Sequence, residues 1–480
     1  MDRSALERLD AYPYRHRVRD VMAGAPAAVA AEASLLEVAR ALRASGESAL
    51  FVDLEGAAGG PGILTERDLV QRLAEGGAPA LELTAGETMS APLVGVEPES
   101  FLFVAIGRMA RLGLRHLAVL DSGGRPVGLL TARRLLRQRA SQALIVGDAV
   151  GAARRPEDLK AVQDGMLELA EALLAEGVEA PEVAAVISAV LREISARAAA
   201  LAAAEVESEQ GPAPAPWAYL VLGSGGRGES LLSADQDNAL VHGGSQADDA
   251  WFARLGERAS AILDGAGIPY CKGGVMASRP AWRHSLEGWA ETIEGWVGRA
   301  EGENLLSVDI FYDFQRVHGD AGLAEALRAR AAAAARRPML PRMMAQELEA
   351  LRAPLTLLGG FRDRGDRLDL KLHGLFPIVA GARAMALRHG VAETSSAARL
   401  QAVAARGLLG EADLAGLLEA RRLFMTLILD QQIRDLRAGA EPGTQVEIAS
   451  LPGPLRDRLR RALRQAASIH STVTSAVAAG

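Results

Sequence analysis

The 480-residue sequence contains one cysteine, Cys271, and few aromatic residues. A single cysteine excludes an internal disulfide and fits a reducing compartment. Aromatic residues make up 4% of the chain although 49% of it is hydrophobic, so alanine and leucine must build much of the interior, which favours packed helices. A chain of this length exceeds one ordinary core, so we expect about two to four domains.

Long hydrophobic runs and a basic excess are also missing. No apolar run reaches the roughly 18 residues of a membrane-spanning helix, and the N-terminal residues are charged, so we expect neither a membrane span nor a signal peptide. The net charge of −7 leaves no basic surface for general nucleic-acid binding, so a nucleic-acid partner is not expected. Together these absences favour a cytoplasmic protein.

A glycine-rich segment near the middle of the chain is the most informative feature that is present. The apolar run at 218–222 predicts a buried strand, which breaks into Gly223, Ser224 and two further glycines. Such a segment has little side-chain bulk, so its backbone N–H groups can approach a phosphate. We expect a short helix to follow, with its N-terminus facing the same anion.

Two aspartates lie at the start of a second predicted strand, at 237–241. Asp235 and Asp237 are two residues apart, so an extended backbone puts both carboxylates on one face. A phosphate-binding segment and paired carboxylates therefore meet at one sheet edge. Such a site would hold Mg²⁺ and a nucleoside triphosphate together.

Other interpretations of this block fit less well. Residues 223–228 match G-x-G-x-x-G after a strand, but a dinucleotide-binding fold needs a longer helix and an acidic residue at the end of the second strand, where this chain has His242. The chain has no Gly-Lys-Ser/Thr sequence, so a P-loop is excluded. A glycine-rich turn followed by two solvated aspartates is the simplest structural alternative.

The block at 223–238 resembles the G-S-x-G-R-x-E…D-x-D signature of the polymerase-β-like nucleotidyltransferase superfamily. It is most similar to the signal-transduction nucleotidyltransferases that follow a pair of CBS domains (cystathionine β-synthase type). These are similar to nitrogen-regulatory uridylyltransferases and glutamine-synthetase adenylyltransferases. The resemblance extends over nearly the whole chain. It implies transfer of a nucleoside monophosphate from a nucleoside triphosphate to an acceptor hydroxyl, with Mg²⁺ or Mn²⁺ as cofactor.

The resemblance also implies roles for residues around the phosphates. Gly223 and Ser224 would hold the triphosphate, and Arg227 would neutralise it or organise the loop. Lys272, beside two glycines, could reach the triphosphate. Cys271 matches the C-x-G-G motif of the family, and we interpret it as a packing residue because no activating base is identified nearby.

The superfamily needs a third carboxylate close to the first pair. Asp235 and Asp237 would bind two metal ions between them. The apolar stretch at 305–314 predicts a later strand, on which Asp309 and Asp313 share a face. Asp313 matches the family position that ligates the catalytic metal and accepts the proton of the acceptor, and Asp309 is the second choice.

Residues 18–140 contain an imperfect internal repeat. Each copy has the β-α-β-β-α order of a CBS module, the first at 18–74 and the second at 75–140. By resemblance, two such modules pack as a pair that binds AMP, ADP or ATP. CBS pairs usually associate face to face, so we also expect a homodimer. A pair that serves only as a dimerisation surface is the alternative.

The nucleotide-binding residues of a CBS module are the Thr and Asp of G-I-x-T-x-x-D. Thr65 and Asp68 match this motif in the first copy. In the second copy Thr131 matches, but Arg134 stands at the Asp position and removes the ribose acceptor. The resemblance therefore implies at most one site of the usual kind.

The fold class we expect is α+β and multidomain. Helical periodicity predicts helices after residue 141 and throughout the C-terminal third, where Lys371, His373 and Arg383 are candidates for lining the acceptor cleft. Helical spacing indicates core packing for Trp289 and Trp296. The remaining predicted segments are an N-terminal tail at 1–17, a helical spacer with a proline-rich linker at 141–211, the nucleotidyltransferase domain at 212–320 and a helical substrate-binding domain at 321–480.

The leading hypothesis is a nucleotidyltransferase that is regulated by adenine nucleotide at the CBS pair. Its acceptor would be a protein or a small molecule. The competing hypothesis is a non-enzymatic regulator that binds nucleotide and signals by conformation. The presence of Asp235, Asp237 and Asp313 argues against the second, because a binding-only domain has no need for three clustered carboxylates.

Overall fold

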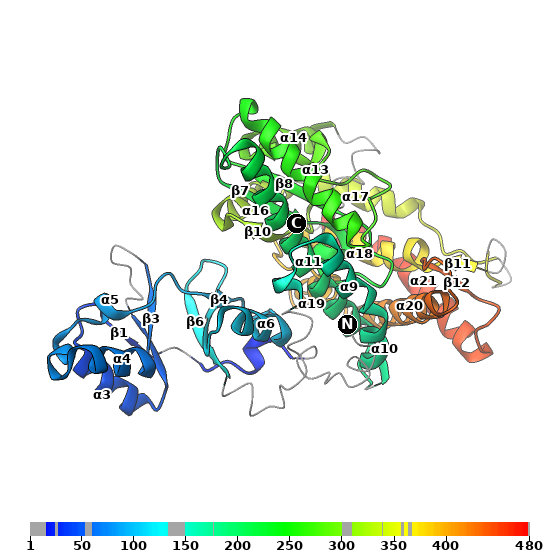
Figure 1. Cartoon of the computed structure of the whole chain (residues 1–480). Coiled ribbons are helices and arrows are strands. Elements are labelled where there is room, and N and C mark those ends of the chain that lie inside the picture. Colours follow the sequence, from blue (N-terminus) through cyan, green and yellow to red (C-terminus); the bar gives the residue numbers. More distant parts are fainter. Residues whose placement is uncertain are drawn as a thin grey trace. The chain divides into compact units, whose positions relative to one another are not determined.

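The computed structural model describes residues 16–24, 27–52, 60–132, 149–175, 177–299, 310–337, 339–356, 360–362 and 367–478. The chain divides into two compact units, Arg8–Ala152 and Ala153–Gly480 (Figure 1). Both units mix helices and strands, so the expected α+β multidomain class is confirmed.

The smaller unit contains two three-stranded sheets with the same topology. In each sheet the first strand runs parallel to the second, and the second runs antiparallel to the third. The strands are β1 (Ala28–Val29), β2 (Ala49–Val52), β3 (Gly62–Thr65), β4 (Gly95–Val96), β5 (His116–Leu120) and β6 (Pro126–Thr131). The internal repeat is therefore confirmed.

Helices cover both sheets of this unit. They are α3 (Leu35–Ser45), α4 (Glu66–Gly76), α5 (Ala85–Thr88) and α6 (Leu102–Leu112), with short 3₁₀ turns at Val18–Asp20 and Ala78–Glu82. One core cluster joins the two copies, because Phe51 of β2 packs with Ala118 of β5 and Leu129 of β6. The two copies thus fold as a pair that shares apolar surface.

A four-stranded mixed sheet organises the larger unit, in the order β10–β7–β8–β9. Its strands are β7 (Trp217–Val221), β8 (Asn238–His242), β9 (Arg283–Ser285) and β10 (Gln315–Gly319). The first two lie within one residue of the strands predicted at 218–222 and 237–241, and they pair antiparallel. The glycine-rich segment therefore lies between two neighbouring strands.

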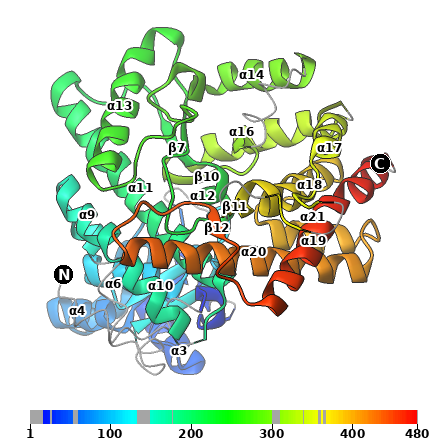
Figure 2. The ribbon, with the colours of Figure 1, turned by 90° about the vertical axis from the view of Figure 1, so that its right-hand side faces the viewer.

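Helices surround this sheet and then form the C-terminal part of the unit. The helices that precede or surround the sheet are α9 (Pro156–Asp164), α10 (Met166–Ala175), α11 (Ala180–Gln210), α12 (Gly223–Arg227), α13 (Asp249–Gly265) and α14 (Leu286–Arg299). The later helices are α16 (Ala321–Ala335), α17 (Met339–Ala350), α18 (Phe376–Arg388), α19 (Ser396–Ala404), α20 (Glu411–Arg437) and α21 (Gly453–Ala478). Figure 2 shows α18, α20 and α21 side by side, and a small sheet of β11 (Arg367–Asp369) and β12 (Gln445–Glu447) lies next to α20.

Helix α11 belongs to this unit, although the sequence predicted a separate spacer at 141–211. Its residues are apolar or small around most of its circumference, and sixteen of them are buried. The helix packs against α13, β7 and β10. A helix that is apolar on several faces is typical of an element surrounded by protein.

The predicted strand at 305–314 is not observed where the structure describes it. Residues 310–313 form the end of a helix and a turn, and β10 begins only at Gln315. Phe311, Tyr312 and Phe314 are all buried in the core of the larger unit, so the apolar residues that suggest a strand serve core packing from a helix end and a turn. Residues 305–309, including Asp309, lie outside the described residues.

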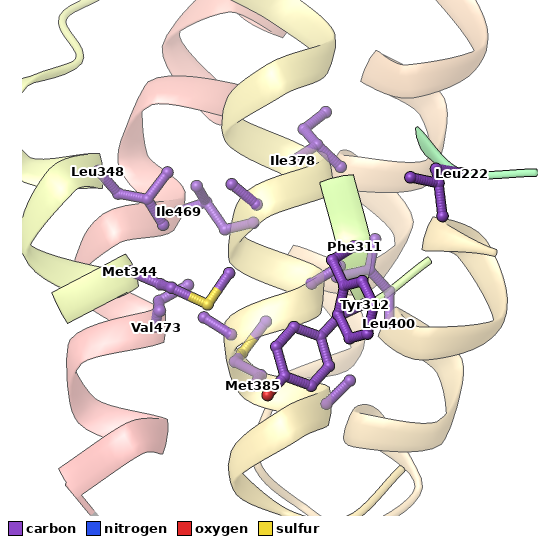
Figure 3. Close-up of a cluster of buried hydrophobic side chains, with 14 of the residues drawn as sticks. Leu222, Phe311, Tyr312, Met344, Leu348, Ile378, Met385, Leu400, Ile469 and Val473 are labelled. Atoms are coloured by element: carbon purple, nitrogen blue, oxygen red, sulfur yellow. The ribbon is translucent and has the colours of Figure 1, made fainter. Parts of the chain in front are cut away.

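The hydrophobic core of the larger unit is continuous from the sheet into the C-terminal helices. Phe311 and Tyr312 pack beside Leu222, next to the glycine-rich segment, and also beside Leu400 of α19 and Met385 of α18 (Figure 3). This core fixes the C-terminal helices against the loop that carries the candidate site.

Candidate active site

The D-x-D block alternates between anchoring and cleft-facing side chains. Gln236 is buried, and its Nε2 donates to the carbonyl oxygens of Ser260 at 3.0 Å and Ile268 at 2.9 Å. Asn238 is also buried and accepts from the Ala277 backbone N–H at 2.8 Å. Asp235, in contrast, is exposed, and Asp237 is half-buried. The two amides therefore hold the strand, while both aspartates lie together as the parity argument predicted.

Gly223 brings the glycine-rich segment directly against this pair. It has a φ of +53°, and a Cβ built on it would lie 2.8 Å from Asp237 Oδ2. The preceding residue, Leu222, donates its N–H to the Asp237 carbonyl oxygen at 2.9 Å. Glycine is required here by both backbone conformation and space. A cleft at this point is lined by Ser224, Asp235, Asp237 and apolar residues that include Leu191 and Ile268.

The glycine-rich segment itself forms the short helix α12, where the sequence predicted a helix after it. The residues of α11 support this segment: Arg192 Nη1 donates to the Gly225 carbonyl oxygen at 2.8 Å, and the Ser188 hydroxyl accepts from the Ser230 N–H at 2.8 Å. Ser230 in turn contacts Ser224, with 3.1 Å between the hydroxyl oxygens. The sequence analysis assigned no chemistry to α11, because its contribution is a supporting contact across the fold.

The electrostatics of the acid pair favour a bound cation. Burial and the neighbouring Asp235 charge raise the pKa of Asp237 to about 6, although Cys271 and Lys371 oppose the shift. Lys371, one of the predicted cleft residues, is the exposed first residue of a π-helical turn, Lys371–Leu375. A positive ion at this place would remove the repulsion that raises the pKa of Asp237.

Cys271 is the third potential metal ligand in this cluster. One donor atom from each of Asp235, Asp237 and Cys271 lies within 4.8 Å of the other two. Burial, followed by the Asp237 charge, raises the pKa of the Cys271 thiol to about 12. The sequence-based interpretation of Cys271 as a packing residue therefore describes only part of its environment. Lys272, the next residue, is exposed on the same loop.

Asp313 does not lie with the acid pair and instead lies at the centre of an arginine cluster. Its Oδ2 accepts from Arg227 Nη1 at 2.5 Å, and its Oδ1 accepts from Arg399 Nη1 at 2.6 Å and Arg383 Nε at 3.1 Å. The carboxylate is completely buried. The hypothesis that Asp313 is the third metal-binding carboxylate is therefore corrected: in this structure three guanidinium groups occupy both of its oxygens.

Arg227 and Glu229, from the signature, extend this cluster into the C-terminal helices. Arg227 Nε donates to Glu229 Oε2 at 2.9 Å. The Glu229 carboxylate also accepts from the Ser396 N–H at 2.8 Å and from Arg421 Nη2 at 3.0 Å. Burial opposes ionisation, but Arg421 and Arg227 lower the pKa of Glu229 to about 2. Arg227 thus forms ion pairs with both Glu229 and Asp313.

Most of this arginine cluster cannot be predicted from the sequence. The sequence predicts Arg383 only as a candidate for lining the acceptor cleft, and it does not identify Ser396, Arg399 or Arg421. The available signal was weak: Arg399 and Arg421 lie on helices whose surrounding residues are largely apolar. Their partners are 86 and 192 residues away in the chain, so no local pattern identifies them.

In the smaller unit, Thr65 and Asp68 are brought together at the start of α4. The Thr65 N–H donates to Asp68 Oδ2 at 2.8 Å, and the Asp68 N–H donates back to Thr65 Oγ1 at 3.3 Å. This reciprocal pair is a helix capping box. Thr131 is buried at the end of β6, opposite His116 in the sheet register. Arg134 lies outside the described residues.

Comparisons with known proteins match this arrangement of domains. A CBS domain model matches residues 18–75 and 85–141. A family described as "Putative nucleotidyltransferase DUF294" matches residues 165–303, and one described as "Putative nucleotidyltransferase substrate binding domain" matches residues 338–477. The first of these ranges includes α11, in agreement with its packing in the larger unit. Within the part of the chain that the structure describes, every helix is too short or too polar to span a lipid bilayer.

Among curated proteins, the uncharacterized protein MK0525 of Methanopyrus kandleri is 32% identical over 120 residues, which are 25% of this chain and 58% of that protein. The chain thus spans less than two thirds of this relative's length. Among solved structures, the CBS-domain containing protein ATU1752 from Agrobacterium tumefaciens is 28% identical, covering 26% of this chain and 98% of its own, with a TM-score of 0.23. The CBS domain protein PAE2072 from Pyrobaculum aerophilum, solved with AMP, is 25% identical, covering 26% and 94%, with a TM-score of 0.23. These matches divide the chain into a CBS domain pair, a region similar to the putative nucleotidyltransferase family DUF294 and a C-terminal region similar to the substrate-binding domain described with it.

Proposed function

We propose that the larger unit transfers a nucleoside monophosphate from a nucleoside triphosphate to an acceptor hydroxyl. The observation that carries this proposal is the contact between Gly223 and Asp237, with Asp235 beside them. It puts a backbone that can approach phosphate next to two carboxylates that can hold a divalent cation. The cleft at this place has an apolar side, which suits a nucleoside.

The donor set fits Mg²⁺ or Mn²⁺. These ions bind through one or two carboxylates and complete their coordination with water and substrate phosphate oxygens. Asp235 and Asp237 supply two carboxylates, and a cation would favour the charged form of Asp237, whose pKa is raised by burial and by the Asp235 charge. When bound, the ion would stabilise charge on the triphosphate and activate the attacking hydroxyl.

The reaction would be an in-line transfer in which residues of the chain hold and neutralise the phosphates. The acceptor oxygen would bond to the α-phosphorus, the bond to the bridging oxygen would break, and pyrophosphate would leave while the hydroxyl proton passes to solvent. Gly223 and Ser224 would lie along the phosphates. Lys371, whose charge already acts on Asp237, would balance the negative charge of the triphosphate from the helical domain. Lys272 is exposed on the adjacent loop and could reach the outer phosphates.

A transfer assay tests this proposal directly. The full chain would be incubated with Mg²⁺ or Mn²⁺, each labelled nucleoside triphosphate and a cell extract as the source of acceptor. We expect a labelled product with wild-type protein and none with Asp237→Asn. The matched control is Asp264→Asn, which removes an exposed carboxylate on α13 that does not line the cleft. Nucleotide binding without transfer would instead favour a non-enzymatic regulator.

We further propose that the CBS pair binds AMP, ADP or ATP in the first copy and regulates transfer. The proposal depends on Thr65 and Asp68, the hydroxyl and carboxylate that the family motif uses for phosphate and ribose. An effector changes activity only if it binds two states of the protein with different affinity. Calorimetry of the full chain with each adenine nucleotide should therefore find one dominant CBS site per chain. In the transfer assay, the nucleotide bound at that site should change the transfer rate several-fold. Association of two CBS pairs would make the protein a homodimer.

A further inference from the structure

The cation site has a third donor of a different chemical kind. Cys271 Sγ lies within 4.8 Å of a carboxylate oxygen of both Asp235 and Asp237. It is the only cysteine in the chain. A thiol in this place does more than fill apolar space, because its nearest charged neighbours are the two acids that the proposed function assigns to a metal.

The backbone holds Cys271 in this position from both sides. The Gln236 N–H donates to the Pro269 carbonyl oxygen at 3.0 Å, and the Asn238 N–H donates to the Val275 carbonyl oxygen at 3.0 Å. The loop that carries the thiol is therefore fixed, at both of its ends, to the same strand segment that carries the two aspartates. A turn in which the Gly274 N–H donates to the Cys271 carbonyl oxygen at 3.0 Å closes the loop.

Two carboxylates and a thiol form a recognisable ligand set. Zn²⁺ binds thiolate, carboxylate and imidazole groups, and in catalytic zinc sites three protein ligands leave a further position open for water or substrate. Mg²⁺ binds oxygen ligands and gains nothing from sulfur. Soft thiolate ligands select thiophilic metals such as Zn²⁺. Cd²⁺ binds the same ligands and can replace Zn²⁺ as a spectroscopic probe.

We propose that Cys271 is the third protein ligand of the cation site, so that Asp235, Asp237 and Cys271 together bind a thiophilic divalent cation of the Zn²⁺ class. This inference rests on the proposed function only in using the same acid pair. It adds a selectivity that two carboxylates alone do not have: thiophilic ions gain a bond to sulfur, whereas Mg²⁺ and Mn²⁺ bind through oxygen. Binding of a thiophilic ion replaces the thiol proton with the metal.

The test is a titration of the full chain with Cd²⁺, followed by the ultraviolet charge-transfer band of a cadmium–thiolate bond. Because the chain has one cysteine, any such band belongs to Cys271. We expect the band in wild-type protein, its absence in Cys271→Ser, and Cd²⁺ affinity at least about tenfold lower in that variant. Asp235→Asn should also lower Cd²⁺ affinity, but should retain the band at saturation.

A second measurement needs no variant. Zn²⁺ should slow alkylation of Cys271 by iodoacetamide at least about tenfold in wild-type protein, and the same concentration of Mg²⁺ should not. Cd²⁺ binding without a thiolate band, or equal alkylation with and without Zn²⁺, would overturn the inference. Because neither readout depends on catalysis, that failure would leave transfer with Mg²⁺ intact, whereas a thiolate band without any transfer would overturn only the proposed function.

Discussion

Removing the charge of Asp313 or of Asp237 should change stability in opposite directions. Asp313 is completely buried and accepts hydrogen bonds from three arginines. Asp313→Asn keeps the shape but leaves these guanidinium groups without their shared counter-charge. Breaking a buried ion pair by removing one partner costs about 3–5 kcal/mol. We therefore expect Asp313→Asn to lower the free energy of unfolding of the larger unit by about this amount.

Asp237→Asn should instead stabilise the metal-free protein at neutral pH. Burial and Asp235 raise the pKa of Asp237 from 3.8 to about 6, so the folded protein holds this proton more tightly than the unfolded chain does. The resulting stabilisation is complete below the unfolded pKa and is lost as the pH rises through about 6. An asparagine cannot ionise, so near pH 7 the variant should be more stable, on the order of 2–3 kcal/mol.

Urea unfolding followed by tryptophan fluorescence measures both effects. All five tryptophans lie in the larger unit, at positions 217, 251, 282, 289 and 296, so the signal reports on that unit. The measurement is made with a chelator present, at pH 4.5 and at pH 7.5. We expect the stability difference between wild type and Asp237→Asn to shrink at the lower pH, whereas Asp313→Asn remains less stable at both. If Asp313→Asn were as stable as wild type and lost metal affinity as Asp237→Asn does, Asp313 would be a metal ligand. That result would refute the structural role of Asp313 in the arginine cluster.

Three further predictions concern the loop, the ion cluster and the CBS pair. Gly223→Ala should lower Mn²⁺ affinity and the transfer rate at least about tenfold, because residue 223 has a φ of +53° and a Cβ there would crowd Asp237. Gly298→Ala, at a position with open space around it, should change neither. Glu229→Gln should lower the free energy of unfolding by about 3–5 kcal/mol, because it leaves Arg227 and Arg421 without their counter-charge. Mn²⁺ affinity at the acid pair should stay within about twofold of wild type. A loss of both stability and Mn²⁺ affinity would contradict a role of Glu229 that is separate from the acid pair. Asp68→Ala should abolish calorimetric binding of AMP to the full chain, whereas Glu37→Ala, which breaks the equivalent capping box of α3, should retain it; equal AMP binding by both variants would exclude Asp68 as a ligand.

The sequence predicted the parts of the site that depend on local geometry. The parity of Asp235 and Asp237 identified a shared face, and the change from an apolar run to glycines identified the turn between β7 and β8. Both features depend on residues within about twenty positions of one another. The repeat of the CBS pair was predictable for a similar reason, since each copy carries its own strand and helix pattern.

The parts that the sequence did not predict depend on contacts between distant segments. A run of apolar residues around Asp313 fits a buried strand, but Phe311, Tyr312 and Phe314 reach the core from a helix end and a turn before β10, and the apolar pattern alone does not distinguish the two. The turn leads the Asp313 carboxylate to the arginines and away from the acid pair. Likewise, nothing near Cys271 in the sequence indicates that its loop is fixed to the strand segment that carries Asp235 and Asp237.

The two halves of the nucleotidyltransferase signature therefore serve different physical purposes in this chain. The D-x-D half supplies two carboxylates, and burial together with the Asp235 charge raises the pKa of Asp237, so this half contributes little to the stability of the metal-free fold. The G-R-x-E half supplies Arg227 and Glu229, which are buried and paired with Asp313, Ser396 and Arg421. Because Ser396 and Arg421 belong to α19 and α20, any movement of these helices acts on the residues that directly follow the phosphate-binding segment. A buried ion cluster is a stiff connection, since separating its charges is costly. The ion cluster thus connects α19 and α20 to the loop beside the acid pair, and the Glu229→Gln variant measures whether this connection affects cation affinity.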